Sequence, residues 1–110
     1  MMQNLGAIYI TKRKMVEEIC NLVAASSIVN RMYVFGSAVT NRCSDESYID
    51  ICIETGCDDR DMRLYDLYCK ISKVCDYNCD ILTYNKLGNG LKVEVDKNGI
   101  VVYEIEEEKC

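Results

Sequence analysis

Residue types that could bind a phosphate and a metal ion occur together in a short stretch at residues 34–54, VFGSAVTNRCSDESYIDICIE. Gly36 and Ser37 follow an apolar run, and a Gly-Ser turn offers N–H groups and a hydroxyl to phosphate oxygens. Asp50 lies in an alternating apolar segment, and Asp80 lies in another. Buried carboxylates are costly unless they are paired or bind a metal. On two neighbouring strands they would converge as hard oxygen ligands, which suit Mg²⁺ and a nucleoside triphosphate.

A purely structural interpretation of the same residues fits their types equally well. In that interpretation Gly36 makes a tight turn, and Asp50 and Asp80 cap loops. The two interpretations differ in whether the carboxylates meet, which depends on the elements that position them.

Those elements alternate between helical and extended patterns, without a linker or a repeat. Apolar residues at helical spacing predict helices over residues 11–28 and from the acidic pair Asp58-Asp59 to Cys75. Alternating residues predict strands, and Asn89-Gly90 and Asn98-Gly99 are turn signals. The predicted strands span residues 31–35, 48–54, 79–84 and 100–105. This order predicts a small α/β (α+β) fold, with helices packed on one face of a mixed sheet.

Composition narrows the function classes. The chain has 110 residues, which we interpret as one domain over residues 1–110, and 49% of them are hydrophobic. Its net charge of −5 does not favour direct nucleic-acid binding, and the run Lys12-Arg13-Lys14 is typical of a solvated helix face. No apolar stretch could span a bilayer and no secretory pattern is present, so we expect a cytoplasmic protein.

The eight cysteines are expected to be reduced thiols without zinc. No Cys-x-x-Cys pair occurs, and the spacing of Cys75 and Cys79 does not match common zinc sites. The chain has no histidine, which excludes Ser-His and Cys-His nucleophile chemistry. A redox or metal-thiolate protein stays open as a remote alternative.

The stretch FGSAVTNRCSDESYIDICI resembles the signature of the nucleotidyltransferase superfamily (polymerase-beta-like), in its minimal nucleotidyltransferase branch. In that signature an apolar strand ends in Gly-Ser, the next strand carries two aspartates, and a later strand carries a third. Gly36 and Ser37 match the turn, Asp50 matches the second carboxylate, and Asp80 in NCDILTY matches the third. The segment KNGIVVYE is similar to the last strand of minimal members, so the resemblance spans nearly the whole chain.

The resemblance implies transfer of a nucleoside monophosphate from a triphosphate to a hydroxyl, with Mg²⁺ held by three carboxylates. It makes Asp50 and Asp80 the expected catalytic and metal-binding residues. Gly36, Ser37 and Arg42 are the expected nucleotide-binding residues.

Tyr48 departs from this pattern, because it stands where the family has its first carboxylate, which bridges both metal ions. Tyrosine is neutral at pH 7, with a reference pKa near ~10. Glu46 shares the parity of Tyr48 but lies about 6–7 Å further back along a strand, and Asp45 lies on the other face or in the loop. We therefore expect weak or absent Mg²⁺ binding and impaired catalysis, unless a loop distortion brings Glu46 inward.

Two functions from different classes stay open. The first is an enzyme, a minimal nucleotidyltransferase that is slow. The second is a catalytically degenerate protein that binds a nucleotide or a partner chain, as an antitoxin does. A chain this small supplies one wall of a cleft, so we expect a homo-oligomer or a second chain. The resemblance implies that such a second chain is a small all-helical HEPN-type protein of a toxin–antitoxin module.

Overall fold

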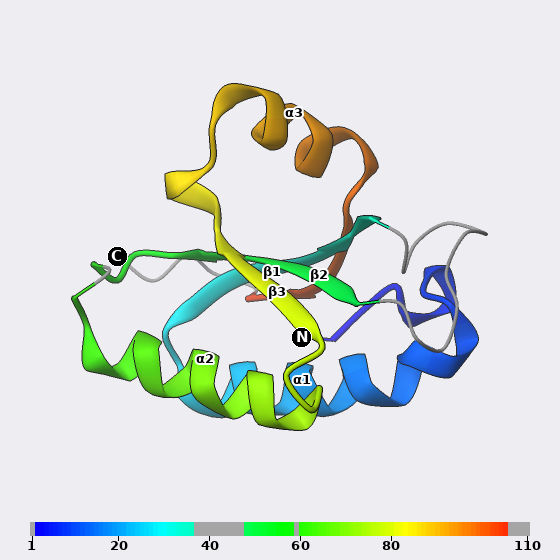
Figure 1. The fold of residues 1–110 in the computed structure, drawn as a ribbon, viewed down its shortest axis with the longest axis horizontal. Helices are drawn as coiled ribbons and strands as arrows, with labels where there is room; N and C mark the ends of the chain where they lie inside the picture. Colours follow the sequence, from blue (N-terminus) through cyan, green and yellow to red (C-terminus); the bar gives the residue numbers. More distant parts are fainter. Residues whose placement is uncertain (1, 37–47, 59, 106–110) are drawn as a thin grey trace.

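A mixed sheet lies at the centre of the computed structural model, which describes residues 2–36, 48–58 and 60–105 (Figure 1). Within these residues the sheet has four strands in the order β3-β2-β1-β4. The central strand β1 pairs antiparallel with β2 and with β4, whereas β2 pairs parallel with β3. The predicted α+β class and mixed sheet are therefore confirmed. The strands are β1 (Val29–Phe35), β2 (Ile49–Thr55), β3 (Cys79–Thr83) and β4 (Ile100–Glu104).

Two helices, α1 (Arg13–Ser26) and α2 (Met62–Val74), lie side by side against one face of the sheet (Figure 1). Each places an apolar stripe on the sheet, because residues three and four apart share one helix face. Short 3₁₀ turns at Leu5–Ala7 and Ile10–Lys12 precede α1. The buried stripe residues are Val16, Ile19, Cys20 and Val23 on α1 and Leu64, Leu67 and Ile71 on α2.

A third helix, α3 (Asn89–Asn98), lies over the opposite face of the sheet, where a 3₁₀ turn at Tyr84–Lys86 leads into it (Figure 1). Its single buried residue, Val95, packs in a second apolar cluster with Tyr33, Phe35 and Cys52. The sequence did not predict this helix. The expected turn at Asn89-Gly90 is wrong, because these residues begin α3.

Element boundaries differ from the predicted ones by a few residues. The first strand begins at Val29 rather than at residue 31, and the second spans Ile49–Thr55 rather than 48–54. The N-cap of α2 is Asp61, whose carboxylate accepts a hydrogen bond from the Arg63 N–H at 2.9 Å. The helix was predicted to start at the acidic pair 58–59, but it begins after Asp61, so Asp58 is not its first residue. Residue 59 lies outside the described residues.

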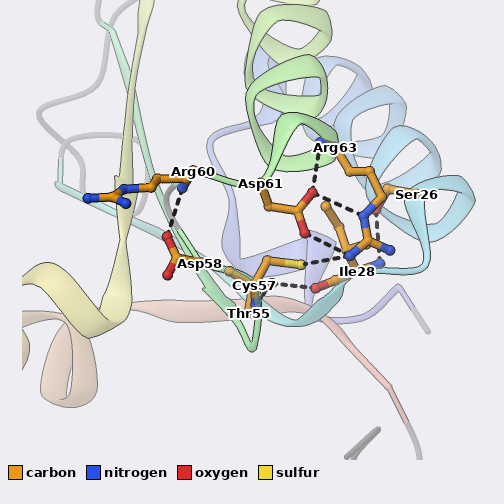
Figure 2. Close-up of polar contacts among 8 residues, drawn as sticks. All are labelled: Ser26, Ile28, Thr55, Cys57, Asp58, Arg60, Asp61 and Arg63. Carbon is orange, nitrogen blue, oxygen red and sulfur yellow. Dashed lines mark hydrogen bonds and ion pairs between the residues drawn. The ribbon is translucent and has the colours of Figure 1, made fainter.

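A polar network joins the end of β2 to the start of β1 and to α2 (Figure 2). The buried Thr55 hydroxyl donates a hydrogen bond to the Ile28 carbonyl at 2.5 Å and accepts one from the Cys57 N–H at 3.1 Å. Beside it, the Arg63 guanidinium forms an ion pair with Asp61 at 2.7 Å and lies 3.9 Å from the Cys57 sulfur. These contacts hold the segment between β2 and α2 in place. The helix α2 then connects β2 to its parallel neighbour β3.

In the part of the chain that the structure describes, no helix has the length and apolar character needed to cross a membrane. Six cysteines lie in that part, and all six are free thiols. The prediction for Cys43 and Cys110 concerns residues outside it.

Candidate functional site

Asp50 and Asp80 lie side by side on neighbouring strands. In the parallel pairing of β2 with β3, Asp50 is the register partner of Asp80. Register partners in adjacent strands direct their side chains to the same face of a sheet. Cys52 and Leu82, two residues further along each strand, pack in the cluster beneath α3, so the two carboxylates share that face.

The electrostatics of this pair indicate two carboxylates in direct contact. Burial raises the pKa of Asp50, and the negative charge of Asp80 and a hydrogen bond between the two side chains raise it further. Among the described residues, no cation forms an ion pair with either carboxylate. Two neighbouring acidic groups without a counter-ion form a site that a cation would stabilise.

The other acidic residue of β2 on this face already has a cationic partner. The Glu54 carboxylate lies 3.6 Å from the Arg31 guanidinium, which also contacts Glu104 at 2.5 Å. The Tyr33 hydroxyl accepts a further hydrogen bond from Arg31 at 3.3 Å. Glu54 thus has a cationic partner, whereas Asp50 and Asp80 have none among the described residues. The uncompensated negative charge on this face therefore lies at the end of the sheet near Gly36.

Gly36 lies directly against the Asp50 carboxylate. Phe35, the last residue of β1, is the register partner of Asp50, and Gly36 follows with a φ of 71°. A Cβ atom at Gly36 would overlap the Asp50 carboxylate: it would lie 3.2 Å from the Asp50 Cγ and closer still to one carboxylate oxygen. Glycine is therefore needed here for two reasons, a left-handed backbone and space for the carboxylate. The sequence predicted the turn, but not this close approach, which follows from the strand register.

The remaining predicted site residues are only partly placed. Tyr48 lies one residue before β2 and is 52% exposed. Ser37 and Arg42 lie outside the described residues, and so do Asp45 and Glu46, the other acidic candidates for the missing ligand. The structure therefore brings Gly36, Asp50 and Asp80 together, and it does not describe the predicted phosphate loop.

The two carboxylates are chemically suited to a magnesium ion. Carboxylate oxygens are the ligands that Mg²⁺ prefers, and Mg²⁺ is commonly bound by one or two carboxylates while it keeps several waters. Among the described residues, no group of three or more His, Cys, Asp or Glu side chains is placed to hold a metal. Asp50 and Asp80 can therefore supply two ligands, but they do not form a closed protein cage.

Several solved structures share this fold. The chain matches a chain of the Shewanella oneidensis complex of a tri-AMPylated HEPN toxin with its MNT antitoxin, with a TM-score of 0.65 and 18% identity over 86% of this chain and 74% of that one. It matches a protein described as a minimal nucleotidyltransferase, with a TM-score of 0.64 and 21% identity over 89% of this chain and 95% of that one.

A third structure, described as a nucleotidyltransferase from Sulfolobus solfataricus, has a TM-score of 0.56 and 27% identity over 86% of this chain and 81% of that one. A search of curated proteins gave no match. The family model described as polymerase beta, nucleotidyltransferase matches residues 17–108, a range that includes Gly36, Asp50 and Asp80. This chain therefore belongs to the polymerase beta nucleotidyltransferase family, and its fold is that of a nucleotidyltransferase domain.

Proposed function

We propose that this nucleotidyltransferase domain binds a nucleoside triphosphate together with a weakly held Mg²⁺, and that it transfers the nucleoside monophosphate slowly to a hydroxyl group. The observation that carries the proposal is the contact between Asp50 and Asp80, which no described cation neutralises. The match of the family model over residues 17–108 supports the reaction class.

The residues of the chain have separate roles in this proposal. Asp50 and Asp80 provide the oxygen ligands, and Mg²⁺, when bound, would neutralise charge on the phosphates. Gly36 allows the backbone to pass close to Asp50, and Ser37 follows it as the expected phosphate contact. The acceptor hydroxyl attacks the α-phosphorus and loses its proton to solvent, the bond from the α-phosphorus to the oxygen that bridges it to the β-phosphate breaks, and pyrophosphate leaves.

The proposed reduction in rate comes from Tyr48. At the position of the first family carboxylate, a neutral phenol supplies no negative charge near the phosphates. The two described carboxylates therefore have to hold the cation without the bridging ligand of the family pattern.

The proposed acceptor is a small all-helical HEPN-type partner. One similar structure is a complex in which a HEPN toxin carries AMP groups and is bound to an MNT antitoxin. We infer the same type of partner here, and we expect the acceptor hydroxyl to lie on it.

Labelled nucleotide transfer tests this proposal. The purified chain is incubated with each α-labelled triphosphate and Mg²⁺ or Mn²⁺, alone and with a small helical protein encoded beside it. We expect slow labelling of the partner, which is lost in Asp50→Asn and Asp80→Asn. Asp66→Asn is the matched control, because Asp66 pairs with Lys70 on the exposed surface of α2.

Three outcomes separate the alternatives. Metal-dependent nucleotide binding without any transfer would favour the degenerate binding protein over the enzyme. Binding of the helical partner without nucleotide binding would favour a partner-binding protein that has lost the nucleotide site. Labelling that persists in Asp50→Asn and Asp80→Asn would overturn the proposed role of the carboxylate pair.

A further inference from the structure

Two cysteines meet where α2 turns into β3. Cys75 is the C-cap of α2, and its N–H donates a hydrogen bond to the Ile71 carbonyl at 3.2 Å. The Asn78 N–H donates to the Cys75 carbonyl at 3.0 Å, so the chain reverses within a few residues. Cys79 then begins β3. The turn therefore returns the chain to the end of the helix it has just left (Figure 1).

The two side chains pack on the same apolar core at the two ends of this turn. Cys75 is 1% exposed in the main apolar core, and the partly buried Cys79 packs against that core. The two thiols influence each other's pKa: interaction with Cys79 and burial raise the pKa of the Cys75 thiol, and interaction with Cys75 lowers the pKa of the Cys79 thiol. A disulfide requires two cysteines whose side chains can approach each other closely, and a tight turn between two cysteines that pack on the same core favours that approach.

The turn itself is held in an uncommon conformation. Asp76 and Tyr77 have φ angles of 52° and 61°, in the left-handed region that residues other than glycine seldom adopt. The Tyr77 N–H donates to the Ser72 carbonyl at 2.7 Å, which holds the turn against the last part of α2. The neighbouring contacts therefore keep Cys75 and Cys79 together rather than leaving their separation to a mobile loop.

We propose that Cys75 and Cys79 form a reversible disulfide by exchange with a small-molecule disulfide such as glutathione disulfide. Cys79 is the more exposed sulfur, so it attacks first. The small disulfide bond breaks, one small thiol leaves, and a mixed disulfide forms at Cys79. The Cys75 sulfur then displaces the second small thiol. Two protein thiols are oxidised, one small disulfide is reduced to two thiols, and both protein protons leave on these thiols.

This modification would lie next to the carboxylate pair. Asp80 directly follows Cys79 in β3 and is the register partner of Asp50. The disulfide would therefore link the end of α2 covalently to the strand that carries Asp80.

Peptide mapping of the wild-type protein tests the proposal. The reduced protein is incubated with glutathione disulfide, its remaining thiols are alkylated in denaturant, and it is digested with trypsin. Cleavage after Lys73 and Lys86 releases residues 74–86, a peptide that contains Cys75 and Cys79 and no other cysteine. We expect this peptide to be unalkylated and lighter by two hydrogens, and to regain both alkylation sites after reduction.

A variant and a control peptide sharpen the result. In Cys75→Ser the second step is blocked, so Cys79 should accumulate as the mixed disulfide. Residues 64–70 form a peptide with Cys69 alone, so it reports the reaction of a single thiol under the same conditions. The proposal is overturned if wild-type residues 74–86 are alkylated twice after oxidation. It is also overturned if Cys79 keeps the small thiol in the wild-type protein or links to another cysteine.

Discussion

Replacement of Gly36 by alanine tests the construction of the site. The φ of 71° is in the left-handed region, where a residue with a Cβ is less stable by about 1–2 kcal/mol. The new Cβ would also overlap the Asp50 carboxylate, which must move. We therefore expect Gly36→Ala to lower the free energy of unfolding by at least about 1–2 kcal/mol from the backbone alone. We expect it to abolish metal-dependent nucleotide binding as well.

Urea denaturation and nucleotide titration measure the two effects separately. Gly56→Ala is the matched control, because a Cβ there meets no atom within 4 Å; it should change stability by less than about 0.5 kcal/mol. Gly36→Asn separates the effect of the left-handed backbone from the effect of the overlap with Asp50. Asparagine tolerates a left-handed backbone but still brings a Cβ against Asp50. If Gly36→Ala is as stable as Gly56→Ala and still binds nucleotide, the inferred contact between Gly36 and Asp50 is wrong.

Two further predictions concern the polar network at the start of α2. Thr55→Val should lower the free energy of unfolding by about 1–3 kcal/mol, because the Ile28 carbonyl and the Cys57 N–H lose a buried partner; Thr55→Ser keeps the hydroxyl, and equal losses in the two variants would contradict this role. Hydrogen bonds from the Arg63 side chain and N–H hold the pKa of Asp61 well below its usual range. A depressed pKa gives stability that is present above the ordinary aspartate value of about 3.9 and is lost as the pH falls through the lower folded value. Asp61→Asn, which can still cap the helix, should therefore lose less stability than the wild type on acidification in denaturant titrations, and identical acid profiles would refute the assignment.

Much of the fold follows from residue patterns. The alternation around Asp50 predicts a strand with one apolar face, and the helical stripes of α1 and α2 are visible in the spacing of their apolar residues. The helix α3 could not be found this way, because Val95 is its only buried residue and its first two residues, Asn89 and Gly90, favour a turn. Its position depends on contacts with distant residues of the sheet.

The candidate site was predictable in its residue types but not in its geometry. Strand parity indicates which residues share a face with Asp50, and Asp80 stands out in the same way, as a lone carboxylate in an apolar strand. That these two are register partners depends on a parallel crossover through α2, which no local pattern specifies. The space that Asp50 needs above Gly36 depends on the register of β1 with β2, which is likewise a tertiary property.

The most direct test of the proposed function is a calorimetric titration of each nucleoside triphosphate, with and without Mg²⁺, into the wild type and Tyr48→Asp. The proposed loss of the first carboxylate predicts that Tyr48→Asp strengthens the Mg²⁺-dependent affinity by about tenfold, which corresponds to about 1.4 kcal/mol. Tyr65→Asp is the matched control, because Tyr65 is 64% exposed on α2 and the charge change is the same. Equal affinities in Tyr48→Asp and Tyr65→Asp would contradict the account, and so would rapid nucleotide transfer by the wild type.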